Sequence, residues 1–441
     1  MVVILLNTRS QTITMKILVV GSGGREHALA WKLAQSNRVT TVFVAPGNAG
    51  TALEPKLTNI NIAVEAIDEL INFAKKEIVA ITLIGPEVPL VAGIVDAFEA
   101  ENLACFGPSK AASQLEGSKK FSKDFLARHA IPTAAYETFT DVTQASTYIK
   151  RMGAPIVIKA DGLAAGKGVI LADTEQQAID AVEDMLKANA FGEAGHRVVV
   201  EEFLKGEEAS FIVMVDGKNI LPMATSQDHK ARDEGDTGPN TGGMGAYSPA
   251  PVVDAAMTDR IMREVIEPTV QGMASEGLPY TGFLYAGIMV APDGTPKVLE
   301  YNCRFGDPET QPIMLRLKSD LVDLLEAALA GKLDTVTADW DTRASLGVVL
   351  AAGGYPNKYN HGDVISGLTT EESDDAKVFH AGTKLDGDNI VTAGGRVLCA
   401  CALGQTVADA QKRAYALADK IQWQDMYLRR DIGHRAISRE K

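Results

Sequence analysis

At 441 residues, the chain is long enough for about three domains with buried cores. Its 46% hydrophobic and 23% charged residues are ordinary for a globular protein that folds in water. The formal net charge of −14 argues against a nucleic-acid partner, because phosphates would be repelled. No apolar run approaches the roughly 20 residues that a membrane helix needs, so a membrane partner is not expected either.

Residues 1–14 are expected to be an unstructured extension. Their short apolar run, Met1 to Leu6, lacks a preceding basic region and is too short for the core of a signal peptide. The fold is therefore expected to begin near Met15. The four cysteines, at positions 105, 303, 399 and 401, match neither a disulfide framework nor a zinc site. Reduced thiols in the cytoplasm are the simpler interpretation.

A doubly wound α/β domain is predicted for residues 15–118. Apolar strands at 16–20, 41–45 and 78–84 are each followed by a glycine-containing turn, with helical stretches between them. Ligands of such domains bind at the loops that follow the strands. A dehydrogenase is disfavoured, because Glu26 stands where the dinucleotide fingerprint requires glycine. The candidate sugar or phosphate contacts, each of which could also be an ordinary turn residue, are Gly21, Gly23, Gly24, Asn48, Gly85 and Glu87.

Lysines mark the next two segments. Lys119 lies in the stretch 116–121 with which a predicted helix begins and, taken alone, would be a solvated surface residue. An apolar strand ends on Lys159 and leads into a loop of small residues in which Lys167 stands between Gly166 and Gly168. Such a loop can fold over phosphates, although a tight hairpin is the alternative. It is not a Walker loop, because that pattern requires glycine at position 161 and serine or threonine at position 168.

A predicted strand at 198–204 runs into a hinge that carries two adjacent carboxylates, Glu207 and Glu208. Backbone groups of a hinge can pair with the edge of a base, and a carboxylate can hold ribose hydroxyls. A solvated carboxylate in a turn is the alternative for either glutamate. The hinge is therefore a candidate nucleoside contact.

Residues 227–247 form the longest polar, glycine-rich segment of the chain. A long segment with little expected secondary structure favours an ordered substrate loop over a linker. Within it, Asp228 could hold the ammonium group of an amino acid, and Lys230 and Arg232 could steady developing phosphate charge. His229 has no partner at metal-ligand spacing, so no metal role is expected for it.

The strand predicted to begin at Val298 carries the densest set of ligand-type side chains. Residues two apart share a face of a strand, so Glu300 and Asn302 point the same way. A carboxylate beside an amide oxygen suits a hard cation such as Mg²⁺. Arg304 follows on the same alternation, and its planar fork matches a carboxylate or phosphate. The alternative is a sheet edge with a surface salt bridge between Arg304 and Glu309.

Residues 336–441 are predicted to form a smaller α/β unit. Its strands are expected at 345–351 and 397–402, with a helix at 406–421. The turns at 352–356 and 392–396 are expected close to a ligand groove. Because this unit lacks a catalytic cluster of its own, a scaffold or site-completing role is expected.

The run Glu-Tyr-Asn-Cys-Arg-Phe-Gly-Asp-Pro-Glu at 300–309 resembles the metal-binding strand of ATP-grasp ligases, and its wording is similar to that of the phosphoribosylamine–glycine ligase family. The resemblance extends from Met15 to Arg435 through at least five motifs in the family's order. It implies a phosphoribosylamine site in the domain at 15–118, an ATP-grasp domain at 119–335 with a lid at about 136–204, and a C-terminal domain at 336–441.

The resemblance also implies roles for the candidate residues. Arg304, Lys230 and Asp228 are expected to be catalytic, with Arg304 on the glycine carboxylate or acyl phosphate. Glu300 and Asn302 are expected to bind Mg²⁺ or Mn²⁺. One departure is that strand 282–290 lacks the further metal carboxylate of many ATP-grasp enzymes, which leaves one or two metal ions open. The expected ATP contacts, with Glu207 as a competitor for the last, are Lys119, Lys159, Gly166, Lys167, Gly168, Glu201, Glu202, Phe203, Leu204 and Glu208.

The implied reaction joins glycine to 5-phosphoribosylamine at the expense of ATP. Glycyl phosphate would be the intermediate, and the products would be glycinamide ribonucleotide, ADP and phosphate, a step of purine biosynthesis. The small-molecule substrates are the only expected partners, and a monomer or weak homodimer is expected. One alternative is another ATP-grasp carboxylate–amine ligase, and a second is a nucleotide-binding regulatory protein without catalysis.

Overall fold

The computed structural model describes residues 14–163, 168–186, 196–368 and 373–440. The expected extension at 1–14 therefore lies almost wholly outside the described residues, and so do the candidate ATP contacts Gly166 and Lys167. In the described part of the chain, no helix is both long and apolar enough to cross a membrane.

The N-terminal unit is a doubly wound α/β domain, as predicted. Its five strands all pair in parallel, in the order β3-β2-β1-β4-β5. The strands are β1 (Met15–Gly21), β2 (Val39–Pro46), β3 (Leu57–Asn59), β4 (Val79–Ile84) and β5 (Cys105–Phe106). The helices are α1 (Gly24–Ala34), α2 (Ala49–Leu53), α3 (Ile67–Glu77), α4 (Glu87–Ala92) and α5 (Ile94–Ala100).

Alternate residues of β1 serve two hydrophobic cores. Ile17 and Val19 belong to a core that also includes Cys399 of the C-terminal unit. Leu18 and Val20 belong to a second core, which continues into the central unit. A parallel strand buried on both faces needs such a continuous apolar run, and this run is what made β1 predictable.

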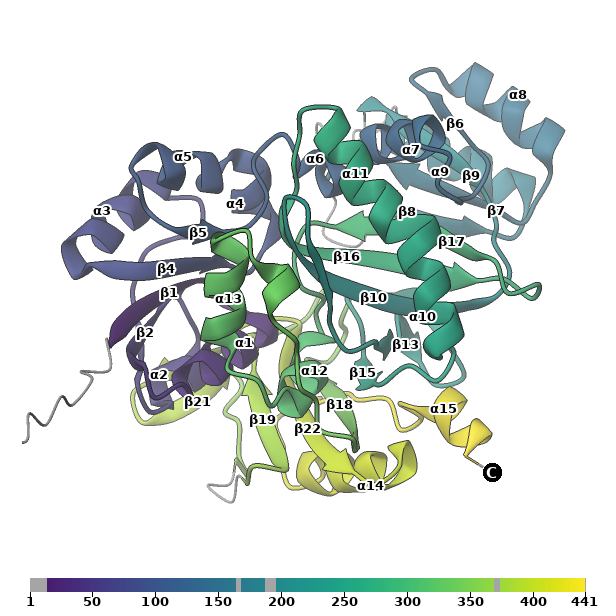
Figure 1. Cartoon of the computed structure of the whole chain (residues 1–441). Coiled ribbons are helices and arrows are strands. Elements are labelled where there is room, and N and C mark those ends of the chain that lie inside the picture. Colours follow the sequence, from purple (N-terminus) through teal and green to yellow (C-terminus); the bar gives the residue numbers. More distant parts are fainter. Residues whose placement is uncertain (1–13, 164–167, 187–195, 369–372, 441) are drawn as a thin grey trace, which may run out of the picture.

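A small unit with its own core follows (Figure 1, upper right). Its antiparallel sheet has the order β6-β9-β7-β8 and lies within the range expected for a lid, although lid motion stays a prediction. The connecting helices are α6 (Gln114–Gly117) and α7 (Lys119–Arg128). The unit itself contains β6 (Tyr136–Phe139), α8 (Val142–Met152), β7 (Ile156–Ala160), β8 (Val169–Ala172), α9 (Glu175–Leu186) and β9 (Val198–Glu202).

The central sheet has the order β11-β10-β16-β17 and is antiparallel. Its strands are β10 (Glu207–Asp216), β11 (Ile220–Pro222), β16 (Thr281–Val290) and β17 (Pro296–Asn302). A helical segment packs on it, formed by α10 (Ala255–Ile261), a π-helical turn (Met262–Ile266) and α11 (Glu267–Ser275). After β17 come α12 (Thr310–Arg316), α13 (Leu321–Leu329) and a short 3₁₀ turn (Leu333–Thr335).

The segment at 227–247 contains more secondary structure than the sequence suggested. It contains four short strands, namely β12 (Gln227–Asp228), β13 (Ala231–Asp233), β14 (Thr237–Asn240) and β15 (Gly245–Ser248). β13 and β14 form a hairpin, and β15 pairs with β18 of the C-terminal unit. The pairing partner of β15 lies about a hundred residues further along the chain, so local patterns could not reveal it.

The C-terminal unit is built on a five-stranded antiparallel sheet of order β12-β15-β18-β22-β19, with the separate hairpin β20–β21 beside it. Its own strands are β18 (Ala344–Ala351), β19 (Ala376–His380), β20 (Thr383–Asp386), β21 (Asn389–Thr392) and β22 (Arg396–Gly404). Its helices are α14 (Val407–Ala418) and α15 (His434–Arg439).

The N- and C-terminal units are joined by a partly buried polar contact. Glu54, at the end of α2, lies 2.5 Å from Nζ of Lys377 on β19 and 3.2 Å from Nε2 of His27 on α1. The backbone N–H of His380 donates to Nδ1 of His27 at 2.8 Å. Although burial alone would raise it, the pKa of Glu54 is lowered to about 2 by His27 and Lys377. The carboxylate is therefore ionised in the folded protein.

Candidate active site

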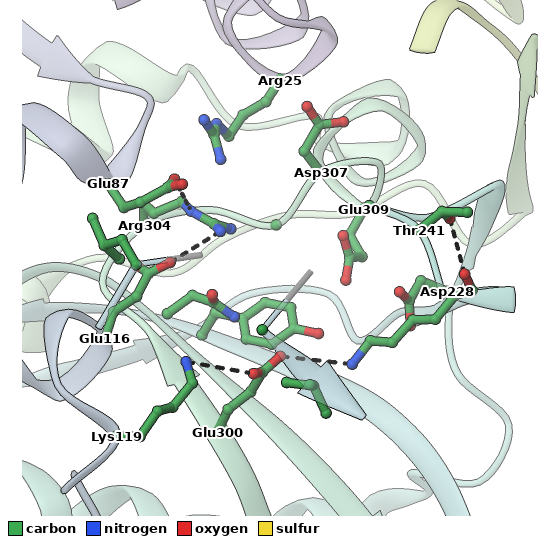
Figure 2. A pocket seen from close by; sticks show the side chains of 18 of the residues that line it. Arg25, Glu87, Glu116, Lys119, Asp228, Thr241, Glu300, Arg304, Asp307 and Glu309 are labelled. Atoms are coloured by element: carbon green, nitrogen blue, oxygen red, sulfur yellow. Dashed lines mark hydrogen bonds and ion pairs between the residues drawn. The ribbon is translucent and has the colours of Figure 1, made fainter. Parts of the chain in front are cut away.

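A cavity of about 330 Å³ lies where the units meet (Figure 2). Of the predicted site residues, those that line it are Glu87, Lys119, Gly168, Asp228, Lys230, Glu300, Asn302 and Arg304. The sequence reasoning did not select several further lining residues, among them Arg25, Glu116, Thr241, Tyr285, Asp307, Glu309 and Arg396. Asp307 and Glu309 follow directly on the ligand-rich strand, which was the available signal for them.

Strand β17 places Glu300 and Asn302 on the cavity wall together, as its alternation predicts. Glu300 pairs across the sheet with Gly287, which has no side chain to cover it. Nζ of Lys230 lies 3.7 Å from Oε1 of Glu300, and Nζ of Lys119 lies 4.0 Å from Oε2. Burial raises the pKa of Glu300, but these ammonium groups outweigh burial and lower it to about 2.

Arg304 also lines the cavity, but its guanidinium is already held by two carboxylates. Its Nε donates to Oε2 of Glu87 at 3.0 Å, and its Nη2 lies 3.0 Å from Oε1 of Glu116. Nη1 donates to the carbonyl of Phe305 at 3.2 Å. Burial opposes ionisation of Glu87, yet Arg304 and Arg25 lower its pKa to about 2. The fork predicted for a substrate carboxylate is thus occupied by the protein's own glutamates.

Asp228 and Lys230 add a dense group of charges to the cavity lining. Burial raises the pKa of Asp228 well above its usual range, Lys230 opposes this, and Glu309 adds to it. Lys230 also pairs with Glu208, and this pair together with Glu300 holds the pKa of Lys230 well above normal despite burial. One lysine therefore serves as the counterion of several carboxylates.

The predicted nucleoside contacts lie around Glu201 on β9. Oε2 of Glu201 lies 2.9 Å from Nζ of Lys123 and 3.0 Å from Nζ of Lys159. Oε1 of Glu201 is buried and has no hydrogen-bond partner among the described residues. Burial lowers the pKa of Lys123 to about 8, although Glu201 opposes this. A buried oxygen without a partner is costly and marks a place where a ligand N–H would fit.

The hinge residues differ from one another in exposure. Glu202 is exposed, Phe203 is half-buried and Leu204 is buried. Glu207 accepts from Gln227 and contacts Arg439, whereas Glu208 contacts Lys230 at the cavity. Of the two competing glutamates, Glu208 is therefore the one nearer the cavity-lining charges.

The glycine turn after β1 does not line the cavity. The carboxylate of Glu26 occupies this turn, where its Oε2 accepts a hydrogen bond from the N–H of Gly23 at 2.6 Å. A Cβ atom added at Gly85 would lie 2.0 Å from Oε1 of Glu26, and one at Gly21 would lie 2.3 Å from its Cγ. These glycines make room for Glu26, a long-range contact that the local pattern did not reveal.

Two more of the predicted contacts of this unit lie apart from the lining. A Cβ at Gly24 would lie 2.5 Å from Nε2 of Gln311, so this glycine is packed against α12. The side chain of Asn48 caps α2 through Thr51 and donates to the carbonyls of Ser22 and His380 at 2.8 Å each. The polar atoms of Asn48 are thus already used within the protein.

His229, between Asp228 and Lys230, points away from the cavity. Its Nε2 accepts from the N–H of Gly433 at 2.9 Å, and its Nδ1 lies 3.5 Å from Oδ1 of Asp236. Asp236 also holds Arg429 at 3.1 Å and Arg435 at 2.7 Å. These contacts, with the hydrogen bond of His229 foremost, keep the pKa of Asp236 well below its usual range.

His229, Asp236 and His434 come close enough together to hold a metal ion by distance alone. Both nitrogens of His229 already have partners, and Asp236 is paired with two arginines. Cations beside the donors disfavour a further cation. We therefore interpret the group as an anchor that joins the segment at 228–236 to the C-terminal residues.

Comparison with known proteins identifies the relationship. Three models of phosphoribosylglycinamide synthetase domains match the chain, the N domain at 15–116, the ATP-grasp (A) domain at 117–310 and the C domain at 345–435. Phosphoribosylamine–glycine ligase of Vibrio cholerae is 67% identical over 427 residues, 97% of this chain and all of the relative. That of Allochromatium vinosum is 66% identical with the same coverage.

Solved structures agree with this relationship. Phosphoribosylamine–glycine ligase of Thermotoga maritima has a TM-score of 0.82 at 34% identity, covering 95% of this chain and all of the other. A biotin carboxylase domain from Hydrogenobacter thermophilus has a TM-score of 0.71 at 14% identity, covering 94% of this chain and 92% of that one, which shows a shared fold alone. The chain belongs to the phosphoribosylglycinamide synthetase family and has its three-domain, ATP-grasp architecture.

Proposed function

We propose that the protein ligates glycine to 5-phosphoribosylamine with ATP, giving glycinamide ribonucleotide, ADP and phosphate in de novo purine biosynthesis. The observation that carries this proposal is the full-length similarity, at 67% identity, to phosphoribosylamine–glycine ligases. The cavity supports it, because an ionised carboxylate flanked by two lysines suits phosphate chemistry.

ATP binds between the small unit and the central sheet in this proposal. The 6-amino group of adenine satisfies the free Oε1 of Glu201, and Lys159 lies beside it at the start of the phosphate path. Glu208 holds the ribose. Lys119 and Gly168 face the phosphates, because both line the cavity and Lys119 lies next to Glu300. The backbone of residues 202–204 supplies the remaining contacts to the base.

The residues present fit a divalent cation. Glu300 is ionised, the amide oxygen of Asn302 shares its face, and both line the cavity. Hard oxygen donors of this kind suit Mg²⁺ or Mn²⁺, which keeps several coordination sites for water and phosphate. When bound, such an ion would offset phosphate charge during transfer. Strand β16 contains no carboxylate that could supply a further ligand beside Glu300 and Asn302. Measurement of the bound metal would decide between one ion and two.

The proposed ligation consists of two nucleophilic displacement steps. An oxygen of the glycine carboxylate attacks the γ-phosphorus of ATP, and ADP leaves, which forms glycyl phosphate. The amine nitrogen of phosphoribosylamine then attacks the acyl carbon, loses a proton and expels phosphate. Lys230 offsets the charge of the transferring group, and Asp228 holds the glycine ammonium. Arg304 holds the carboxylate or acyl phosphate, which displaces one of its present partners, Glu87 or Glu116. No nucleophile of the protein is needed.

The test is turnover of the purified protein with Mg²⁺-ATP, glycine and phosphoribosylamine generated in the cuvette, since that amine is labile. ADP and phosphate formation should require all three, and the product should have the mass of glycinamide ribonucleotide. Turnover with a different carboxylate or amine would favour the other ATP-grasp ligases. Nucleotide binding without ADP formation would favour a regulatory protein.

We also infer a cytoplasmic enzyme that acts as a monomer or weak homodimer. All four cysteines are free and buried, which agrees with reduced thiols. Size-exclusion chromatography with light scattering over a range of protein concentrations would test the oligomeric state.

A further inference from the structure

Basic side chains line the cavity at two opposite ends, and the proposed reaction uses those at one end only. Lys119 and Lys230 flank Glu300 at one end, while Arg25 and Asp307 lie on the opposite side (Figure 2). Arg396 joins this second end, because its Nη2 lies 3.2 Å from Oδ2 of Asp307. The second end combines α1 of the N-terminal unit with β22 of the C-terminal unit.

A side chain of the protein fills the turn that the sequence favoured for a substrate phosphate. Glu26 takes the N–H of Gly23 and packs against Gly21 and Gly85, so a protein carboxylate stands where the phosphate was expected. The side-chain amide of Asn48 donates its hydrogens to two backbone carbonyls. An anionic group of the substrate therefore needs other donors.

Arg304 is not available for this purpose without breaking existing pairs. Each of its three nitrogens already contacts Glu87, Glu116 or the carbonyl of Phe305. Breaking a buried charge pair leaves the partner uncompensated, which is costly.

Arg25 and Arg396 each have a guanidinium nitrogen without a hydrogen bond to a described residue. Nε of Arg25 donates to Glu26 at 2.6 Å, and Nη1 donates to the carbonyl of Phe305 at 3.3 Å. Its Nη2 has no partner in the part of the chain that the structure describes. Nη1 of Arg396 donates to the carbonyls of Gly242 and Asp307, while its Nε has no hydrogen bond to a described residue.

Asp307 holds Arg396 in place, and burial restricts Arg25. Burial would raise the pKa of Asp307, but Arg396 and Arg25 lower it, so this carboxylate stays ionised beside Arg396. Arg25 is only 6% exposed, which limits the freedom of its guanidinium. A preorganised guanidinium pays little entropy when it binds a phosphate.

We propose that Arg25 and Arg396 bind the 5-phosphate of the phosphoribosyl substrate, a phosphomonoester, at the end of the cavity opposite Glu300. This inference rests on the proposed function. The phosphate is remote from the amine that reacts, so its binding energy orients that amine toward the acyl carbon near Glu300. Because the arginines come from two units, the site is complete only when the N- and C-terminal units are together.

Binding of ribose 5-phosphate, a stable compound without the amine, tests the proposal by calorimetry. Arg25→Gln and Arg396→Gln should each weaken its binding by about tenfold to a hundredfold, since a charge-assisted contact is lost. Binding of Mg²⁺-ADP should be unchanged, and ribose without phosphate should bind all proteins equally weakly. Arg263→Gln, at a surface arginine whose side chain is 67% exposed, is the matched control.

Steady-state kinetics provide the second readout. The KM for phosphoribosylamine should rise in both variants, with kcat, the KM for ATP and the KM for glycine much less affected. Arg25→Lys should restore part of the affinity, and it replaces Arg25→Gln if the latter does not fold. A raised KM for glycine alone, or unchanged binding of ribose 5-phosphate, would overturn the assignment. If the wild-type protein binds ribose 5-phosphate but does not ligate glycine, the proposed function fails while the phosphate site stands.

Discussion

Nζ of Lys230 lies 3.7 Å from Oε1 of Glu300, and the same ammonium group contacts Glu208. The lysine comes from the segment after β12 and the glutamate from β17, so two distant segments meet in one charge cluster. Removing this counterion would leave several carboxylates to repel one another.

Lys230→Met should lower kcat by about a hundredfold, because a preorganised charge at the transferring phosphoryl group is lost. The pKa of Glu300 should rise in the variant, which would move the acidic limb of the pH–rate profile toward neutral pH. Steady-state kinetics from pH 5 to 9 measure both effects. Lys150→Met, at an exposed position on α8, is the control. An unchanged acidic limb would contradict the electrostatic role.

Glu300→Ala should abolish turnover at any practical Mg²⁺ concentration, because a metal ligand is removed. Mg²⁺ should also lose its effect on ADP affinity in this variant, which calorimetry with and without the ion would show. If the variant turned over at the wild-type rate at low Mg²⁺, Glu300 would not be a metal ligand.

Glu201→Gln should raise the KM for ATP by about tenfold, since the buried carboxylate that faces Lys123 and Lys159 loses its charge. If the free Oε1 receives the 6-amino group of adenine, the preference for ATP over ITP should narrow, because hypoxanthine has a carbonyl at that position. Competition between the two nucleotides at fixed glycine measures the preference. An ATP to ITP ratio equal to that of the wild type would place the base elsewhere.

Glu54→Gln tests the contact between the N- and C-terminal units. The pKa of Glu54 is about 2 in the folded protein and near 4.5 in the unfolded chain, so its stabilisation is present above pH 4.5 and is lost as pH falls toward 2. The variant should be about 1–2 kcal/mol less stable at pH 6, allowing for solvent screening. Urea unfolding at pH 6, 4.5 and 3 should show this difference shrinking with acidification, and a constant difference would refute it.

Asp236→Ala should destabilise the protein by about 3 kcal/mol, because Arg429 is fully buried and would lose a charge partner. The segment that carries Asp228 and Lys230 would also lose its anchor, so kcat should fall while ADP affinity stays the same. Urea unfolding and calorimetry measure these effects, with Asp259→Ala on the exposed face of α10 as the control. Loss of ADP binding together with kcat would indicate general unfolding instead.

Local patterns predicted those features that local physics determines. The apolar run of β1 and its neighbours predicted a parallel sheet, and the period of two in β17 placed Glu300 and Asn302 on one wall of the cavity. Family resemblance supplied the architecture and the proposed chemistry. The roles of the individual residues stay predictions until the variants are measured.

Long-range packing explains what the sequence could not reveal. Nothing near Gly21 indicates that the side chain of Glu26 turns back into the glycine turn. Arg304 has the right position in its strand, yet its partners Glu87 and Glu116 lie about two hundred residues earlier. The turn at 392–396 was expected close to a ligand groove, but neither Arg25 nor Arg396 was predicted as a site residue. Each is an ordinary arginine in its own segment, and only the fold brings both to the cavity that Asp307 lines.

The pairing of β15 with β18 has a consequence for attempts to divide the chain. A fragment ending before Ala344 would keep the residues of β17 but leave β15 as an unpaired edge, next to the segment that carries Asp228 and Lys230. Exposed edges of this kind invite aggregation. Excision or transplantation of the ATP-grasp part alone should therefore yield an inactive, poorly soluble product, whereas a separately expressed C-terminal fragment could restore activity by supplying the missing strand in trans.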